Sequence, residues 1–173
     1  LLSHDLIEAS YARAGLATDI SLYDDYPAHY LSYSRRKHRW IRGDWQLMRW
    51  LMPWVPGPDG RDRNPLSMLS RWKIFDNLRR SVNEIALLVF LVAGWTVLPG
   101  ASWRWMILAL GAIAAPWIVS LLLAIMRPPL DRSWAAYYEA VGHDAMVSAQ
   151  QVFLANVFLP HQAWSSLHAV AIT

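Results

Sequence analysis

Apolar and polar positions divide this chain into two kinds of segment. Between residues 81 and 126 the only charged residues are Glu84 and Arg104, whereas nearly all other Lys, Arg, Asp and Glu lie before or after that stretch. Within it, apolar runs cover residues 81–100 and 103–126. Because about 20 helical residues cross a hydrocarbon core of about 30 Å, the second run is long enough to span a bilayer and the first is just long enough. The pattern predicts two membrane helices, with a buried helical hairpin in a large soluble core as the weaker alternative.

An amphipathic pattern precedes the apolar runs. Residues 65–80 place their apolar side chains on one stripe of a helix and most of their charged side chains off it. Such a helix can lie in the interface of a bilayer. By the positive-inside rule, the basic residues that flank the two runs put both flanks on the cytoplasmic side. These residues are Arg71, Lys73, Arg79 and Arg80 before the runs, and Arg127 and Arg132 after them.

Further elements are expected before the amphipathic segment. Residues 1–15 predict a helix that Ser3 can cap, and a short strand is expected near residues 20–23. Residues 28–52 predict one long helix or two abutting helices. The cluster of Pro and Gly at 53–65 predicts a loop.

The end of the chain predicts helices again. Residues 132–141 and 145–159 have helical patterns, and Pro160 is expected to break the second helix. The whole chain is therefore expected to consist of a cytoplasmic part over 1–64, an interfacial helix over 65–80, membrane helices over 81–100 and 103–126, and cytoplasmic or interfacial helices over 127–173 that lead to a further membrane segment.

Composition favours a membrane protein over an ordinary soluble domain. The 173 residues are 55% hydrophobic and include 11 Trp, with a formal net charge of +3. This surplus is small for nucleic-acid binding, and the Arg residues lie beside Trp and apolar runs, so a membrane surface explains them better. The absence of cysteine excludes a disulfide framework, a thiolate nucleophile and a cysteine metal site. Because the chain starts at Leu1 without Met or a leader, we expect it to be an excerpt of a longer protein.

The first candidate for chemistry is Asp5. A carboxylate at the exposed start of a helix is well placed to act as a general base. An acidic residue also stabilises the first turn of a helix, and from this cluster alone that simpler interpretation is the stronger one. His4, Asp5 and Glu8 could belong to a metal site, but nothing nearby supplies the further ligands that a closed site needs.

The second candidate is the basic cluster that contains Arg36, Arg39 and Trp40. On a helix these residues stand at i, i+3 and i+4, so two guanidinium groups and one indole share a face. Guanidinium groups bind pyrophosphate bidentately and an indole can stack on a pyranose ring, which suits a sugar nucleotide. Contact with lipid headgroups is an equal alternative for this cluster. Residues 46–50 repeat the spacing, and we favour the earlier copy because it is more basic.

Four stretches carry a combined pattern that is more specific than either candidate alone. They are residues 2–9 (LSHDLIEA), 23–27 (YDDYP), 36–45 (RKHRWIRGDW) and 71–80 (RWKIFDNLRR). Together they resemble the glycosyltransferase region of bacterial cyclic β-1,2-glucan synthases. The first and third stretches show a more distant likeness to the membrane glucosyltransferases of osmoregulated periplasmic glucans and to cellulose synthase.

The resemblance implies a fold, a location and a reaction. The chain would be mainly α, as the C-terminal part of a GT-A-type α/β glycosyltransferase domain followed by the interfacial and transmembrane helices. The protein would be a multi-pass protein of the bacterial inner membrane with its catalytic part in the cytoplasm. It would transfer glucose with inversion from UDP-glucose to a growing β-glucan. A divalent metal, Mg²⁺ or Mn²⁺, is implied with ligands outside this chain, and the chain alone is expected to be inactive.

The resemblance also implies roles for individual residues. Asp5 matches the catalytic base, with His4 at the position where Glu is commoner. Arg36, Arg39 and Trp40 match the (Q/R)-x-x-R-W motif, whose Arg side chains would stabilise the departing diphosphate while the Trp forms part of the acceptor platform. No metal ligand is assigned within the chain.

Two alternatives stay open. A linear periplasmic-glucan or cellulose-like synthase would share these motifs, and a non-catalytic membrane anchor would carry them for structural reasons. The expected partners are UDP-glucose, the growing β-glucan and the lipid bilayer, and no nucleic acid is expected.

Overall fold

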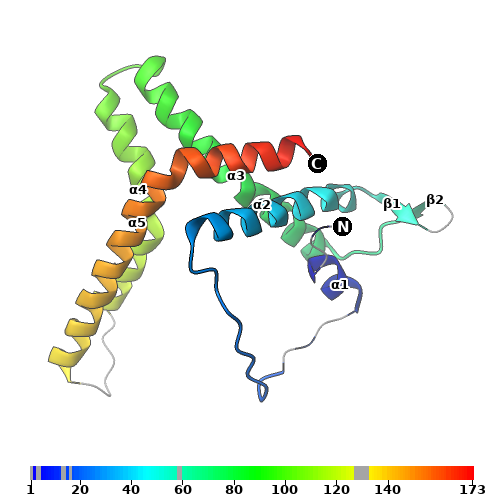
Figure 1. The fold of residues 1–173 in the computed structure, drawn as a ribbon, viewed down its shortest axis with the longest axis horizontal. Helices are drawn as coiled ribbons and strands as arrows, with labels where there is room; N and C mark the ends of the chain where they lie inside the picture. Colours follow the sequence, from blue (N-terminus) through cyan, green and yellow to red (C-terminus); the bar gives the residue numbers. More distant parts are fainter. Residues whose placement is uncertain (1, 3–4, 13–14, 16, 58–59, 127–132) are drawn as a thin grey trace. The chain divides into compact units, whose positions relative to one another are not determined.

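The computed structural model describes residues 2, 5–12, 15, 17–57, 60–126 and 133–173 (Figure 1). This part of the chain is mainly helical, with one small two-stranded sheet, which agrees with the predicted helical character. The chain divides into two units, the first made of residues 1–85 and 162–173 and the second of residues 86–161.

The first unit begins with α1 (Asp5–Ala12), which is shorter than the predicted helix over 1–15. The expected cap Ser3 lies outside the described residues. Residues 20–23 do not form a strand, so that prediction is wrong. Leu22 and Tyr23 are 91% and 99% exposed, and no described strand pairs with them. A strand without a neighbour leaves its backbone groups unpaired, so the segment stays irregular.

Two abutting helices follow. This was one of the two alternatives predicted for residues 28–52. α2 (Tyr30–Gln46) continues directly into the 3₁₀-helix η1 (Leu47–Leu51). Leu47, at the junction, is 1% exposed and belongs to the core of this unit, together with Leu66 and Ile74.

The predicted loop over 53–65 contains a β-hairpin instead of a purely irregular segment. Strands β1 (Trp54–Gly57) and β2 (Gly60–Arg63) pair antiparallel, with Gly57 opposite Gly60. Gly60 has φ +125°, which glycine adopts without strain. The Gly residues therefore stand at the adjoining ends of two paired strands here. At the base of the hairpin, the Asn64 side chain donates to the carbonyl oxygens of Trp50 and Met52 at 2.7 and 2.8 Å.

Helix α3 (Met68–Thr96) runs without a break through the predicted boundary between residues 80 and 81. No Pro or Gly occurs near that boundary to interrupt it. Its first part belongs to the first unit, where Ile74, Leu78 and Ser81 are buried. The separation into an interfacial helix and a membrane helix stays a prediction.

The second unit contains the end of α3, all of α4 (Ser102–Met126) and most of α5 (Trp134–Ala171). Within the described residues, α4 is the one helix that is long and apolar enough to cross a membrane. α3 and α4 approach closely at Gly94, where an added Cβ would lie 2.6 Å from the Cβ of Trp105. The rings of Phe90 and Trp105 meet edge to face at 6.0 Å.

α5 is a single helix, so the prediction that Pro160 ends a helix is wrong. Proline lacks an N–H and can remove the bond to the carbonyl four residues earlier, at Asn156, but the turns on both sides remain helical. Near the start of α5, the Tyr137 hydroxyl donates to the Ala124 carbonyl of α4 at 2.6 Å. Arg127 and Arg132, used in the prediction of orientation, lie outside the described residues.

Candidate functional site

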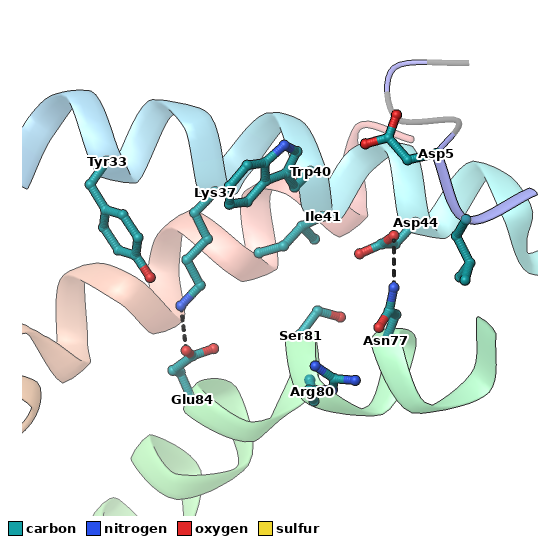
Figure 2. A pocket seen from close by; sticks show the side chains of 11 residues that line it. Asp5, Tyr33, Lys37, Trp40, Ile41, Asp44, Asn77, Arg80, Ser81 and Glu84 are labelled. Atoms are coloured by element: carbon teal, nitrogen blue, oxygen red, sulfur yellow. Dashed lines mark hydrogen bonds and ion pairs between the residues drawn. The ribbon is translucent and has the colours of Figure 1, made fainter. Parts of the chain in front are cut away.

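A cleft of about 460 Å³ lies in the first unit, between α1, α2 and α3 (Figure 2). Its wall mixes charged, amide, hydroxyl, aromatic and aliphatic side chains. The lining residues are Asp5 and Leu6 from α1, Tyr33, Lys37, Trp40, Ile41 and Asp44 from α2, and Asn77, Arg80, Ser81 and Glu84 from α3.

The contribution of α2 follows from helical spacing. Residues three, four or seven apart lie on one face of a helix, and the lining positions 33, 37, 40, 41 and 44 have these separations. The face that lines the cleft therefore combines a phenol, an ammonium group, an indole and a carboxylate.

The structure brings two of the four predicted site residues to this cleft. Asp5 and Trp40 both line it, although 35 positions separate them in the sequence. Trp40 is 41% exposed, so part of its ring is open to a ligand. Arg36 and Arg39 do not line the cleft. The Arg36 guanidinium carbon lies 5.8 Å from the centroid of the Trp40 ring, which keeps one of the two cations beside the indole.

One charged pair in the cleft was not predicted from the sequence. Lys37 of α2 forms an ion pair with Glu84 of α3 and donates to the Gln162 side chain of α5 at 3.0 Å. The Ser166 hydroxyl of α5 donates to the other Glu84 carboxylate oxygen at 3.4 Å. A signal for this pair was available, because a lone Glu84 at the edge of an apolar run needs a partner. In the structure that partner is Lys37, which belongs to the first unit.

A second polar pair, also missed, joins Asp44 of α2 to Asn77 of α3. The Asn77 amide donates to Asp44 Oδ1 at 3.3 Å. Burial raises the pKa of the Asp44 carboxyl, and the Asn77 hydrogen bond and the charge of Arg80 act in the opposite direction. Beside this pair, the Trp45 indole donates to the Ser81 hydroxyl at 2.9 Å, so α2 and α3 are tied at several points.

The described part of the cleft does not offer a ligand set for the implied Mg²⁺ or Mn²⁺. Among the described residues there is no group of three or more His, Asp and Glu side chains that could hold a metal ion. Asp44 and Glu84 are bonded to Asn77 and Lys37 respectively. His4, considered above with Asp5 and Glu8, lies outside the described residues.

Comparison with known proteins shows what this chain resembles. No family model matches it. Its sequence is, however, homologous to a segment of a bacterial glucan synthase.

That relative is the cyclic beta-(1,2)-glucan synthase NdvB of Rhizobium meliloti (strain 1021), to which the chain is 42% identical over 166 residues. The match covers 94% of this chain and 6% of the synthase. The resemblance to cyclic β-1,2-glucan synthases is therefore confirmed, and the chain spans a small part of the length of its relative.

Proposed function

We propose that this chain is part of a membrane-bound inverting glucosyltransferase that polymerises glucose from UDP-glucose into β-1,2-glucan. Its homology to a cyclic glucan synthase supports the class of reaction. The structural observation that carries the proposal is the meeting of a carboxylate, Asp5, and a partly open indole, Trp40, in one cleft.

In the proposed reaction, the acceptor sugar stacks on Trp40 with one hydroxyl directed at Asp5. The hydroxyl oxygen attacks C1 of the donor glucose while Asp5 takes the hydroxyl proton. A C1–O bond to the acceptor forms and the C1–O bond to UDP breaks with inversion. Holding the two sugars in line supplies much of the rate, and a positioned base contributes about 10²- to 10⁴-fold.

The departing UDP carries negative charge that Arg36 and Arg39 would stabilise. Neither side chain lines the cleft, but Arg36 lies beside the Trp40 ring. The proposal therefore places the diphosphate at the edge of the cleft, on the far side of the indole from the acceptor. A metal site, if the reaction uses one, would be built from residues outside the described part of this cleft.

A chimera tests the function. The corresponding segment of the Rhizobium meliloti synthase is replaced by this chain, and membranes are assayed for glucan formed from radiolabelled UDP-glucose. We expect the chimera to be active and Asp5→Asn to lower transfer by about 10²-fold or more while UDP-glucose binding persists. Asp19→Asn, an exposed carboxylate in the irregular segment before α2, is the matched control and should have no effect.

The product identifies the kind of synthase. Linkage analysis should find 2-linked glucose, whereas 4-linked glucose would favour a cellulose-like enzyme. If Asp5→Asn makes glucan at the normal rate, Asp5 is not the base. If the chimera is active and neither Asp5→Asn nor Trp40→Ala lowers glucan formation, both motifs are structural and the chain serves as a non-catalytic anchor. The isolated chain should show no tight binding of UDP-glucose by calorimetry.

The proposal also places α4 across the inner membrane and residues 1–64 in the cytoplasm. Because the chain has no cysteine, single introduced cysteines report their own surroundings. In intact spheroplasts, Ala9→Cys on α1 should react with an impermeant maleimide only after lysis, and Ala112→Cys in the middle of α4 should not react in either state. Labelling of Ala112→Cys in intact membranes would exclude a spanning α4.

A further inference from the structure

The cleft contains a polar pair that the proposed reaction leaves unused. Asp44 stands four residues after Trp40 on α2, so the carboxylate and the indole lie on neighbouring turns of one helix face. Figure 2 shows Asp44 and Asn77 directed toward each other from α2 and α3, on the same side of the cleft as Asp5. We propose that Asp44 and Asn77 bind hydroxyl groups of the acceptor sugar and fix its rotation on Trp40, so that they determine which hydroxyl is glucosylated. This inference rests on the proposed function, because it assigns the acceptor to the same cleft.

The need for such a pair follows from the geometry of stacking. A flat indole fixes the plane of a pyranose ring but leaves the ring free to turn within that plane. As the ring turns, different hydroxyl groups of the glucose face the catalytic base. Polar atoms at the edge of the platform remove this freedom, because they bond hydroxyls at fixed ring positions.

The chemistry of the two side chains suits neighbouring hydroxyls. The Asp44 carboxylate accepts hydrogen bonds, and the Asn77 amide both donates and accepts. One amide hydrogen of Asn77 is used in the bond to Asp44 Oδ1. The second amide hydrogen, the amide oxygen and the second carboxylate oxygen have no side-chain partner among the described residues. Together they form one donor and two acceptors at the edge of the cleft.

The Asp44–Asn77 pair differs from the Lys37–Glu84 pair in how fully its carboxylate is bonded within the protein. Glu84 has a cation, Lys37, and a hydroxyl, Ser166, one on each carboxylate oxygen. Asp44 accepts a single hydrogen bond, of 3.3 Å, from an amide. This bond and the 3.4 Å Ser166–Glu84 bond are both longer than the usual range of about 2.7–3.2 Å, so the difference between the two acids is the Lys37 cation on Glu84. The nearby Arg80 guanidinium is bonded to Asp76 instead. Asp44 is thus the less fully bonded of these two acids, and a ligand hydroxyl would complete its hydrogen bonds.

The test uses the active chimera with soluble β-1,2-linked glucose oligomers as acceptors. Initial rates are measured against oligomer concentration at saturating UDP-glucose, and the linkage of the new bond is determined. Asn77→Ala should raise KM for the oligomer about tenfold with kcat changed less than about threefold, since a lost hydrogen bond to a sugar weakens binding by about that factor. New linkages other than 1,2 should appear, and more glucose should be released by water. Asn83→Ala, an exposed amide on the same helix outside the cleft, is the control.

The exchanged variant Asp44→Asn with Asn77→Asp keeps one acid and one amide. It should recover much of the 1,2-selectivity that Asn77→Ala loses, a result that loss of folding would not produce. The inference is overturned if Asn77→Ala matches Asn83→Ala in KM and linkage, or if only kcat falls. If the chimera with Asp5→Asn is as active as the chimera without it, the proposed function fails, whatever the result for Asn77→Ala. Loss of activity in Asp5→Asn with unchanged behaviour of Asn77→Ala refutes this inference alone.

Discussion

The two units of the chain use different means to hold helices together. In the first unit, apolar side chains such as Leu47 and Ile74 are buried at 1% exposure, and polar pairs such as Lys37–Glu84 join one helix to another. In the second unit, α4 buries only Ala109, and its many Leu and Ile side chains face outward. Helices there meet at Gly94 by close backbone approach.

The difference has a physical cause if α4 lies in lipid, as proposed. In water, burying apolar surface drives helices together, and polar pairs then select one arrangement. In a bilayer, lipid tails are as apolar as Leu, so outward apolar side chains carry no penalty and small residues provide the contact. The first unit is therefore expected to depend on its core, and the second on steric fit.

The largest expected effect comes from removing a core side chain. Ile74→Ala should lower the free energy of unfolding by about 2–5 kcal/mol, because it loses buried area and leaves a cavity. Ile118→Ala removes the same atoms from a side chain on α4 that is 41% exposed, and should cost about 1 kcal/mol or less in detergent micelles. Denaturant unfolding of both variants makes the comparison. Equal losses would show that the two units do not differ in this way.

A smaller effect should follow from adding one methyl group between helices. Gly94→Ala places its Cβ 2.6 Å from the Cβ of Trp105, so α3 and α4 must shift, at a cost of about 1–3 kcal/mol. Gly111→Ala on α4 meets no atom within 4 Å and should leave the second unit as stable as before or more stable, since alanine favours the helix. Thermal unfolding in detergent micelles measures both. Similar midpoints for the two variants would mean that Gly94 is not a contact point.

The charged pair of the first unit is expected to contribute less. Glu84→Gln removes one charge from the pair with Lys37, whose side chains are 22% and 21% exposed, and we expect a loss of about 1–2 kcal/mol. Glu139→Gln, an exposed residue of α5, should change stability by less than about 0.5 kcal/mol. A double-mutant cycle with Lys37→Met isolates the pair. Additive losses in that cycle would show that the two charges do not interact.

These contrasts explain how much could be predicted from the sequence. Helices have a local period, so helical segments were predicted over most of α2, α3, α4 and α5, and the predicted bounds of 103–126 agree with α4. α3 and α5 are each one helix where two segments were predicted. The hairpin was missed because Pro and Gly occur in loops and in tight turns alike. Pro160 was misjudged because a long helix tolerates the loss of one backbone bond. Boundaries that lack a local signal, such as the one predicted between residues 80 and 81, were set by hydropathy alone.

The candidate site was predicted in part for a related reason. Asp5 and Trp40 each belong to a local motif, and the structure brings them to one cleft. Asp44 and Asn77 lie 33 positions apart, and their pairing depends on how α2 packs on α3, which no local pattern reports. The spacing of the lining residues on α2 was a usable signal, whereas the basic cluster indicated Arg36 and Arg39, which do not line the cleft.

The smallest expected effect concerns pH and the end of α5 that belongs to the first unit. His38 of α2 and His168 of α5 lie with Nε2 and Nδ1 3.0 Å apart. Burial, followed by the charges of His168 and Arg42, lowers the pKa of His38 below its ordinary value of 6.5. The unfolded chain then binds a proton more readily than the folded one, so stability is fully present above about pH 6.5 and falls as the pH drops through the lower folded pKa.

The thermal midpoint of the wild-type chain should therefore fall slightly between pH 7.5 and pH 5, by more than that of His168→Gln, which lacks the second imidazole. His143→Gln, an exposed histidine of α5 in the second unit, should keep the wild-type pH dependence. Both histidines of the pair are near the surface, so the difference is expected to be a degree or two. If His168→Gln and the wild type lose stability in parallel, the His38–His168 pair does not link the packing of α5 on α2 to a proton. The association of α5 with the first unit would then depend on the packing of Ala163, Ser166 and Ala169, all at most 3% exposed.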